Sequence, residues 1–551
     1  MATGGRRHGR PRTKKHAANF ALSGFCCIFA AIMEYNTLTL PNGLRIIHLP
    51  SASPVVYCGY CIAAGTRDEG PGQEGMAHFC EHTTFKGTAR RRSWHIINCL
   101  ESVGGDLNAF TTKEDTVYHA AILRDHFPRA VDLLTDIVFH SRYPQQEVEK
   151  EIEVICDEIE SYNDSPAELI YDEFDSRLFA GHPLGHNILG RAERLRTFTP
   201  ADALAFTARL YRPDNAVFFA YGDIDFRRAA RLLQKATADF PPAAPRGPRP
   251  SGPMPAYTPG ETTADRATHQ AHVMIGTRAY SAHDDRRMAL YLLNNMLGGP
   301  GMNARLNIAL RERNGLVYTV DSSMVSYSDT GSWCIYFGCD THDVQRCRRL
   351  VRRELDRMMQ KPLTPTQLAA AKKQIKGQIA VACDSRESFA LDFAKGYLHY
   401  GREKDPAELF AMIDAITPAA IQQVAQELFA PDRLTTLIYG SALTETPAAG
   451  KAPTPLPAAN RPLSQIESVL PVLPALPALS VLPALPALPV LPVLPVLPVL
   501  PALPALSLSM PVRGSANCNI FIEIYCSWHL PTGIWLAHSI ATMLHPSINH
   551  L

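Results

Sequence analysis

The chain alternates between two kinds of hydrophobic pattern from residue 34 onward. The segment MEYNTLTLPNGLRIIHLP (33–50) has two short apolar runs on either side of a Pro-Asn-Gly turn, which predicts two strands joined by a tight connection. In contrast, EVEKEIEVICDEIESY (147–162) places its apolar residues 148, 152, 155 and 159 at helical spacing. This mixture of strands and helices predicts an α+β protein.

The same arrangement of segments occurs twice along the chain. CIAAGTRDEG (61–70) is matched by MIGTRAYSAH (274–283), and a helical segment follows each. YRPDNAVFFAYGDID (211–225) is matched by FAPDRLTTLIYGSA (429–442). We therefore predict two homologous repeats, each a mostly antiparallel sheet with helices packed on it.

The repeat fixes the predicted domain boundaries. A chain of 551 residues exceeds one compact core, so two or more domains are expected. We assign residues 34–239 to the first domain and residues 263–442 to the second. Residues 240–262 are rich in proline, which predicts a semi-extended linker between the two.

The composition changes after the second repeat. In the low-complexity tail at 443–512, proline recurs at every third position from Pro471 to Pro504 except at Ser480, a period that suits polyproline II. Such a tract cannot build a core, and a low-complexity artefact of the reading frame is an alternative origin. The last segment, 513–551, shows no periodicity, and we assign it no role.

The N-terminal segment 1–33 has no acidic residue, a basic first half and an apolar second half. Three interpretations compete: a secretory signal, an organellar presequence, or an upstream extension with Met33 as the true start. We favour the extension because the strand pattern begins directly after Met33. The apolar stretch from Phe20 to Met33 is too short to cross a bilayer, so no membrane span is expected.

Charge and cysteine content narrow the class of protein. The net charge of +1 gives no electrostatic reason to expect nucleic acid as a partner. The 13 cysteines are odd in number and scattered, which indicates a reducing compartment. Cys58 and Cys61 have redox spacing, but they lie in a predicted strand, where residues three apart point to opposite faces. We expect a cytoplasmic, bacterial-type protein; a mitochondrial matrix or exported protein is the alternative.

Candidate metal chemistry begins at HFCEH (78–82). On a helix, His78 and His82 share a face and can together bind one Zn²⁺, while Glu81 flanks the same face and can take a proton from water. A zinc site that keeps one position open needs a third protein ligand. Glu151 and Glu158 lie two helical turns apart on the predicted helix 147–162. One of them can complete the site, and the other can orient a histidine.

These residues resemble a known family. HFCEH followed by KEIEVICDEIESYNDSP is similar to the zinc metallopeptidases of family M16, the pitrilysin and insulinase class, and especially to its short processing proteases. The resemblance covers residues 34–440. It implies that Glu158, 76 residues beyond His82, is the third ligand and that Glu151 supports the site from the second shell.

The resemblance also implies where a substrate binds. GGDLNAFTTKEDTVYHA (104–120) resembles the family segment in which an Asn-Ala pair, here Asn108 and Ala109, lies on a strand that pairs with the peptide. In the second repeat, YLLNNMLGG (291–299) stands where the first has HFCEH, so no metal site is expected there. The Gly-rich segment that follows carries the family's Arg and Tyr, here Arg311 and Tyr318, which reach the substrate carbonyl.

The family's chemistry gives the expected function. The resemblance implies a zinc-dependent endopeptidase that hydrolyses peptides or presequence-like segments, with one Zn²⁺ per chain and Glu81 as the catalytic general base. Two repeats form half of the family's peptide-enclosing chamber. We therefore expect a homodimer in which each zinc site receives Arg311 and Tyr318 from the other chain. The alternative is a non-catalytic member that acts as a partner or scaffold subunit.

Overall fold

The structure, a computed structural model, describes residues 33–243, 254–266 and 268–440. Its described part is a mixed α+β fold with two sheets, as the sequence predicts. The first sheet has six strands and the second has five. The predicted strand–turn–strand at the start of the first repeat is confirmed, with Gly43 in the left-handed region at φ +86°.

Several predicted segments lie wholly or partly outside the described residues. These are the N-terminal extension except for Met33, and the two tail segments 443–512 and 513–551. The predicted linker, 240–262, is described only at its two ends. Strand β7 begins at Glu261, so the last two residues of that predicted linker already belong to the second sheet.

The first repeat carries the longer series of elements. In chain order they are β1 (Asn36–Thr39), β2 (Arg45–Pro50), β3 (Val55–Ile62), η1 (Thr66–Asp68), α2 (Met76–Thr84), α3 (Ser93–Glu101), β4 (Asp106–Thr111), β5 (Thr116–Leu123), η2 (Arg124–His126), α4 (Phe127–His140), α5 (Gln145–Asn163), α6 (Pro166–Leu178), η3 (Pro183–Gly185), α7 (Ala192–Leu195), α8 (Pro200–Leu210), η4 (Pro213–Asn215), β6 (Ala216–Gly222) and α9 (Phe226–Ala236).

The second repeat follows the same order with fewer short helices. Its elements are β7 (Glu261–Ala264), β8 (Gln270–Ala279), α10 (Arg287–Gly298), the π-helix η5 (Asn307–Glu312), β9 (Val317–Ser326), β10 (Gly331–Asp340), η6 (Thr341–Asp343), α11 (Val344–Gln360), α12 (Pro365–Ala382), α13 (Arg386–Tyr400), α14 (Pro406–Ala415), α15 (Pro418–Leu428), η7 (Pro431–Arg433) and β11 (Thr435–Tyr439).

The two sheets have matching strand orders. The first runs β1-β2-β6-β3-β5-β4 and the second runs β7-β11-β8-β10-β9. Each has one parallel pair, β2 with β6 and β7 with β11, and its other neighbours are antiparallel. The hairpins β4–β5 and β9–β10 are equivalent in this order, so β4 and β9 are edge strands of their sheets.

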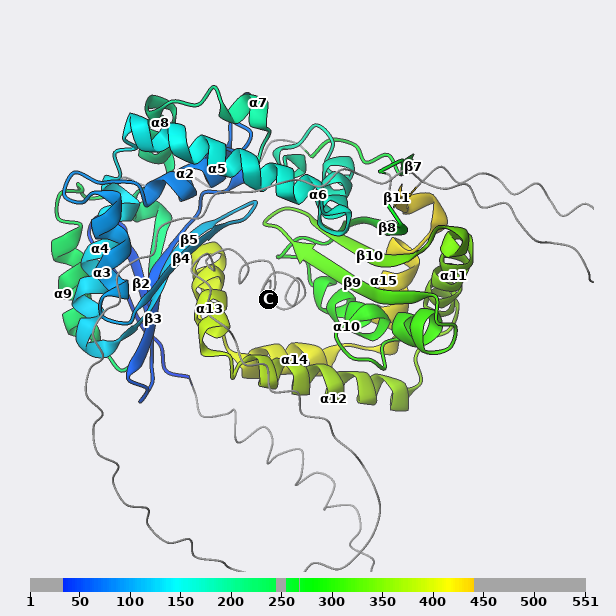
Figure 1. The fold of residues 1–551 in the computed structure, drawn as a ribbon. Helices are drawn as coiled ribbons and strands as arrows, with labels where there is room; N and C mark the ends of the chain where they lie inside the picture. Colours follow the sequence, from blue (N-terminus) through cyan, green and yellow to red (C-terminus); the bar gives the residue numbers. More distant parts are fainter. Residues whose placement is uncertain (1–32, 244–253, 267, 441–551) are drawn as a thin grey trace, which may run out of the picture. The chain divides into compact units, whose positions relative to one another are not determined.

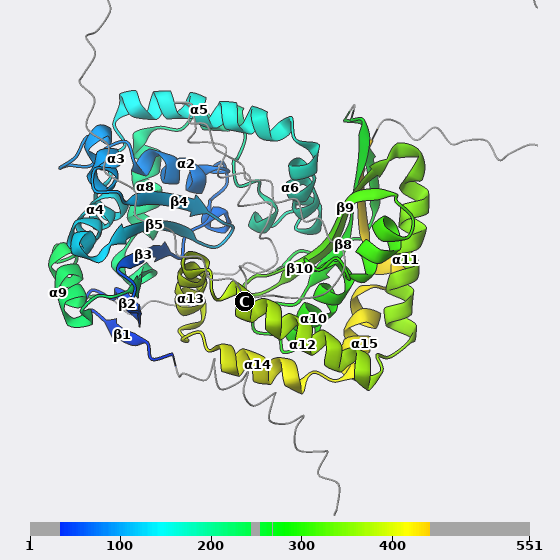
Figure 2. The same ribbon diagram turned by 60° about the horizontal axis from the view of Figure 1, so that its bottom comes forward.

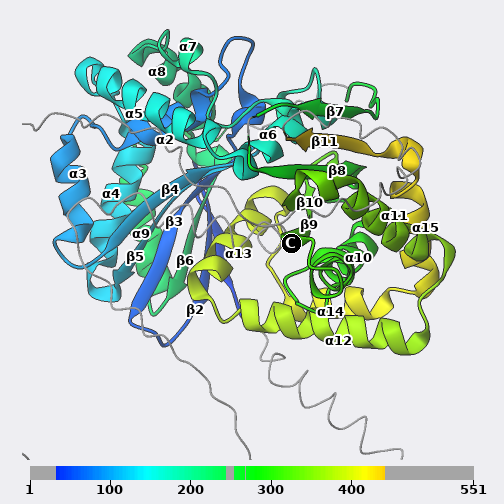
Figure 3. The same ribbon diagram turned by 45° about the vertical axis from the view of Figure 1, so that its right-hand side comes forward.

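Helices cover both faces of the first sheet (Figure 3). One face packs against α2, α3, α4, α8 and α9 in the larger core. The opposite face packs against α13 through Phe389, Phe393 and Leu398. Cys58 belongs to the first of these cores and Cys61 to the second, so the prediction that they point to opposite faces of β3 is confirmed.

The two repeats exchange one helix each. Helix α13 belongs to the second repeat by sequence, yet it packs on β3 and β6 of the first sheet (Figure 1). Helix α6 belongs to the first repeat, yet Leu169, Ile170 and Phe174 pack against β8, β10 and β11 of the second sheet. Each sheet is therefore covered on one face by a helix from the other repeat, which joins the two cores.

None of the helices in the described ranges is long and apolar enough to cross a membrane.

Candidate metal centre

Helix α2 carries the HFCEH residues and lies between α5 and β4 (Figure 2). It begins after Gly75, whose φ of +94° lies in the left-handed region that favours glycine. Met76, Phe79 and Cys80 face the core and are fully or almost fully buried. This apolar side fixes the helix and leaves the side with His78 and His82 directed toward α5.

Three side chains from two helices converge at this point. Nε2 of His78 lies 3.9 Å from Oε2 of Glu158, and Nε2 of His82 lies 3.5 Å from the same oxygen. One ligand-type atom from each of the three residues lies within 4.8 Å of the others. The two imidazole rings stand edge to face, with their centroids 4.5 Å apart. Two imidazole nitrogens and one carboxylate oxygen are the donor set of a catalytic zinc site, so these residues fit the ion.

Glu151 contacts the far side of the His82 ring. Its Oε1 lies 3.1 Å from Nδ1 of His82, and its Oε2 lies 2.6 Å from Nζ of Lys86. Burial raises the pKa of the Glu151 carboxyl, but the bonds from His82 and Lys86 outweigh it and hold that pKa below its usual value. An ionised Glu151 accepts a hydrogen bond from Nδ1–H of His82, which places the lone pair of Nε2 on the side of Glu158.

Glu81 is buried beside the ligand group. Its Oε2 accepts a hydrogen bond of 2.6 Å from the hydroxyl of Thr111 at the end of β4. Burial raises the pKa of Glu81, against the lowering effects of His82 and Thr111. A carboxyl with a raised pKa is suited to take and return a proton near neutral pH.

Asn108 and Ala109 lie on β4, close to this group. They pair with His119 and Tyr118 of β5, and β4 is the last strand of its sheet. The other side of β4 therefore has no strand partner among the described residues. An edge strand can accept an extended peptide as an additional strand.

Arg311 and Tyr318 lie in the second repeat and contact each other. Arg311, on the π-helix η5, places its guanidinium carbon 5.5 Å from the centre of the Tyr318 ring. Tyr318 lies on β9, the edge strand equivalent to β4, and is 81% exposed. The guanidinium of Arg311 also lies 4.0 Å from the carboxylate of Glu312.

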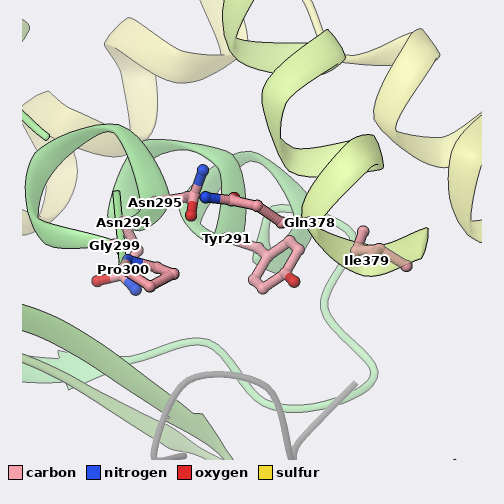
Figure 4. A pocket seen from close by; sticks show the side chains of 7 residues that line it. All are labelled: Tyr291, Asn294, Asn295, Gly299, Pro300, Gln378 and Ile379. Atoms are coloured by element: carbon pink, nitrogen blue, oxygen red, sulfur yellow. The ribbon is translucent and has the colours of Figure 1, made fainter. Parts of the chain in front are cut away.

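The Gly-rich segment before η5 lies beside α10 and α12. Tyr291, Asn295, Gly299, Pro300 and Gln378 line a small cavity there, of about 20 Å³, together with two neighbours (Figure 4). Such a volume holds one water molecule at most, so it is not a substrate pocket. Helix α10 takes the place of α2 in this repeat and contains no histidine, cysteine or carboxylate.

Two contact residues of the site were not predicted from sequence. Thr111, which binds Glu81, is two residues beyond Ala109 on the same strand, so strand alternation alone places both on one face. Lys86, which binds Glu151, follows α2 in a loop and carries no pattern that would mark it. A second group of possible ligand atoms comes from Asp340, His342 and Asp343, of which the first two are exposed, and exposed acidic groups of this kind are common without an ion.

Comparison with known proteins identifies similar chains. Residues 46–192 match the family described as "Insulinase (Peptidase family M16)", and residues 197–375 match "Peptidase M16 inactive domain". An uncharacterized zinc protease of Streptomyces coelicolor is 32% identical over 71% of this chain and 86% of its own length. An uncharacterized zinc protease of Bacillus subtilis is 31% identical over 73% of this chain and 98% of its own.

Two solved structures share the fold. A protease from Helicobacter pylori superposes with a TM-score of 0.69 at 21% identity, over 74% of this chain and 99% of its own. A peptidase M16 inactive domain from Pseudomonas fluorescens superposes with a TM-score of 0.68 at 20% identity, over 75% of this chain and 100% of its own.

Proposed function

Because the chain belongs to peptidase family M16, we propose that it is a zinc-dependent endopeptidase that hydrolyses peptides or presequence-like segments. The convergence of His78, His82 and Glu158 from α2 and α5 is the observation that carries this proposal. The names of the relatives, zinc proteases, agree with it.

We assign one Zn²⁺ per chain to these three ligands. Nε2 of both histidines and a carboxylate oxygen of Glu158 would hold the ion, and Glu151 would keep the His82 ring in place through Nδ1. When bound, zinc lowers the pKa of water and polarises the scissile carbonyl.

Glu81 acts as the general base in this proposal. Its buried carboxylate takes the proton of the attacking water and passes it to the nitrogen of the leaving amine. Thr111 donates a hydrogen bond to Oε2 of Glu81, and we assign the proton transfer to the other oxygen, Oε1. The raised pKa of Glu81 favours the return of the proton in the second step.

The peptide would add as a strand to β4 beside Asn108 and Ala109. Pairing through main-chain groups gives affinity that depends little on side-chain sequence. Arg311 and Tyr318 contact each other on the second repeat, where the Tyr318 side chain is largely exposed, so we assign them to the metal site of a second, identical chain. A homodimer with two-fold symmetry supplies each site with one such pair.

A non-catalytic partner subunit is the other function class. It is disfavoured because this chain retains His78, Glu81, His82 and Glu158 in one cluster. Measurement of zinc content together with hydrolysis of a quenched peptide separates the two. A zinc peptidase contains about one Zn²⁺ per chain and cleaves the peptide, and loses both with a chelator. Zinc without cleavage, or no zinc at all, would contradict the proposal.

A further inference from the structure

A four-residue turn, Thr66–Glu69, lies between β3 of the first sheet and α2, which is called the metal helix below because it carries His78 and His82. The turn contacts both repeats. Arg67 is directed toward the second repeat, and Glu69 is directed toward α2. Both side chains are almost fully buried. A buried charge requires fixed partners, so the partners of these two residues define the position of the turn.

Arg67 joins the two equivalent hairpin turns. Its Nη1 donates to Glu114, in the β4–β5 turn, at 2.7 Å, and to Asp329, in the β9–β10 turn, at 2.8 Å. Nη2 donates to the second oxygen of Asp329, which makes this ion pair bidentate. Ser328 also donates to Glu114, from its hydroxyl at 2.7 Å and its main-chain nitrogen at 3.2 Å. These bonds attach the β9–β10 turn of the second repeat to the first repeat, which carries His78, His82 and Glu158.

Glu69 provides the N-terminal cap of the metal helix. The main-chain N–H groups of Gly75 and Ala77 donate to its Oε1 at 3.1 and 2.9 Å. The first N–H groups of a helix have no partner inside the helix, and α2 has no acidic residue in its first turn. The residues next to the start of α2 provide no side-chain cap, and the carboxylate of Glu69, six residues before Gly75, accepts these hydrogen bonds instead.

We propose that Arg67, Glu69 and Asp329 are positioning residues for the metal helix, and that the second repeat orders this helix by holding Arg67 through Asp329. The Arg67 and Glu69 side chains are two residues apart in one tight turn, so a turn released by Asp329 also releases the cap on α2. The effect on zinc rests on the proposed metal site, since His78 directly follows the capped residue Ala77.

The inference gives the second repeat, which lacks the HFCEH residues, a role at the metal site of its own chain. Glu114 adds a second connection, because β4 links its turn to Thr111 and hence to Glu81. The contact of Arg67 therefore bears on both the ligand helix and the general base. It differs from the partner-chain role proposed for Arg311 and Tyr318, which lie on η5 and β9.

The test compares three single variants with a matched control. Asp329→Asn weakens the ion pair, Glu69→Ala removes the cap, and Glu69→Gln keeps an oxygen that can accept from both N–H groups. The control is Glu173→Gln, which weakens in the same way another ion pair between the repeats, that of Glu173 on α6 with Arg266. Zinc affinity is measured by competition with a chromophoric chelator. Hydrogen exchange of residues 76–84 is measured on the metal-free full-length protein.

Asp329→Asn and Glu69→Ala are each expected to weaken zinc binding about tenfold and to speed exchange in residues 76–84. Glu69→Gln and Glu173→Gln are expected to remain close to wild type. The double variant Asp329→Asn with Glu69→Ala should be no weaker than Glu69→Ala alone, because both changes act through one cap.

The inference is overturned if Asp329→Asn leaves hydrogen exchange in residues 76–84 at the level of the Glu173→Gln control. It is also overturned if the losses of zinc affinity caused by Asp329→Asn and by Glu69→Ala add fully in the double variant. A wild-type protein that binds no zinc would contradict the proposed function instead. Exchange of the metal-free helix decides the inference in that case as well. Asp329 is partly exposed, so its Asn variant is expected to fold even where Glu69→Ala does not.

Discussion

Nδ1 of His82 lies 3.1 Å from Oε1 of Glu151, while Nε2 of the same ring lies 3.5 Å from Glu158. One histidine thus connects the two glutamates of α5, which lie two turns apart on that helix. In the proposed site, Glu158 shares the ion with His82 and Glu151 orients the ring.

Replacement of Glu158 is expected to reduce zinc binding far more than replacement of Glu151. Glu158→Gln removes a charged ligand, whereas Glu151→Gln only loosens the orientation of His82, an effect of about 10-fold to 100-fold in metal affinity. Zinc content after dialysis against a weak chelator, measured by atomic absorption, provides the comparison. If Glu151→Gln loses the metal while Glu158→Gln retains it, the two roles are exchanged.

Glu81→Gln is expected to retain zinc and lose turnover. The amide cannot take a proton from water, and the loss of a general base reduces rates by about 10²- to 10⁴-fold. Hydrolysis of a quenched peptide gives the rate, and zinc content serves as the control for an intact site. Near-normal activity in this variant would exclude Glu81 as the base.

Two inactive variants are expected to complement each other if the dimer shares its sites. Glu81→Gln and Tyr318→Phe chains are mixed under conditions that allow exchange. In the mixed dimer, one site combines an intact metal group with an intact partner tyrosine, so activity partly returns. Tagged chains purified in two steps show whether exchange occurred. No recovery in proven mixed dimers would mean that Tyr318 acts within its own chain or that the natural partner is a different chain.

Asp321→Asn is expected to stabilise the protein at alkaline pH. Burial raises the pKa of Asp321 to about 7, although a hydrogen bond from Tyr171 of α6 lowers it. The native carboxyl therefore holds a proton that the unfolded chain has released, and the free energy of unfolding falls as pH rises from about 4 to 7. In the Asn variant position 321 has no ionisable carboxyl, so its stability does not fall in this way with pH. The amide oxygen still accepts a hydrogen bond from Tyr171.

Melting temperatures of the Asp321→Asn variant and the wild type at pH 5 and pH 8 test this. The advantage of the variant over wild type in free energy of unfolding should grow by about 1–2 kcal/mol between pH 5 and pH 8. Asp175, whose pKa burial raises to about 6, remains in both proteins and leaves some pH dependence. A variant that is less stable than wild type at pH 8 would contradict the assigned cause.

Phe393→Ala is expected to destabilise the whole described fold although it lies in the second repeat. Phe393 is fully buried on α13, and its ring contacts Tyr35, which directly precedes β1, and Phe219 of β6. Truncation of a buried phenylalanine costs about 3–5 kcal/mol. Leu391→Ala, on the same helix but only partly buried, serves as the control. Thermal unfolding followed by circular dichroism should show a large loss for Phe393→Ala alone.

The sequence by itself determined the local structure and the content of the candidate site. Strand and helix patterns depend on the spacing of neighbouring residues, so the hairpin at 36–50, the helix with HFCEH and the helix with both glutamates were predicted correctly. The internal repeat in the sequence predicted two similar sheets, and the two sheets have matching strand orders. Helical spacing places His78 and His82 on one face of α2, whereas Glu158 was expected beside them only from the family resemblance, since it lies on another helix.

The tertiary structure alone decided which surfaces meet. Helices α6 and α13 both present apolar residues at helical spacing, and that pattern does not specify which of two similar sheets they cover. Which sheet each helix covers is decided by packing between residues that are far apart in the sequence. The contacts of Lys86 with Glu151, and of Arg67 with Asp329, arise in the same way. A single charged residue has no periodicity, so its partner is fixed only when the folded chain brings distant turns together.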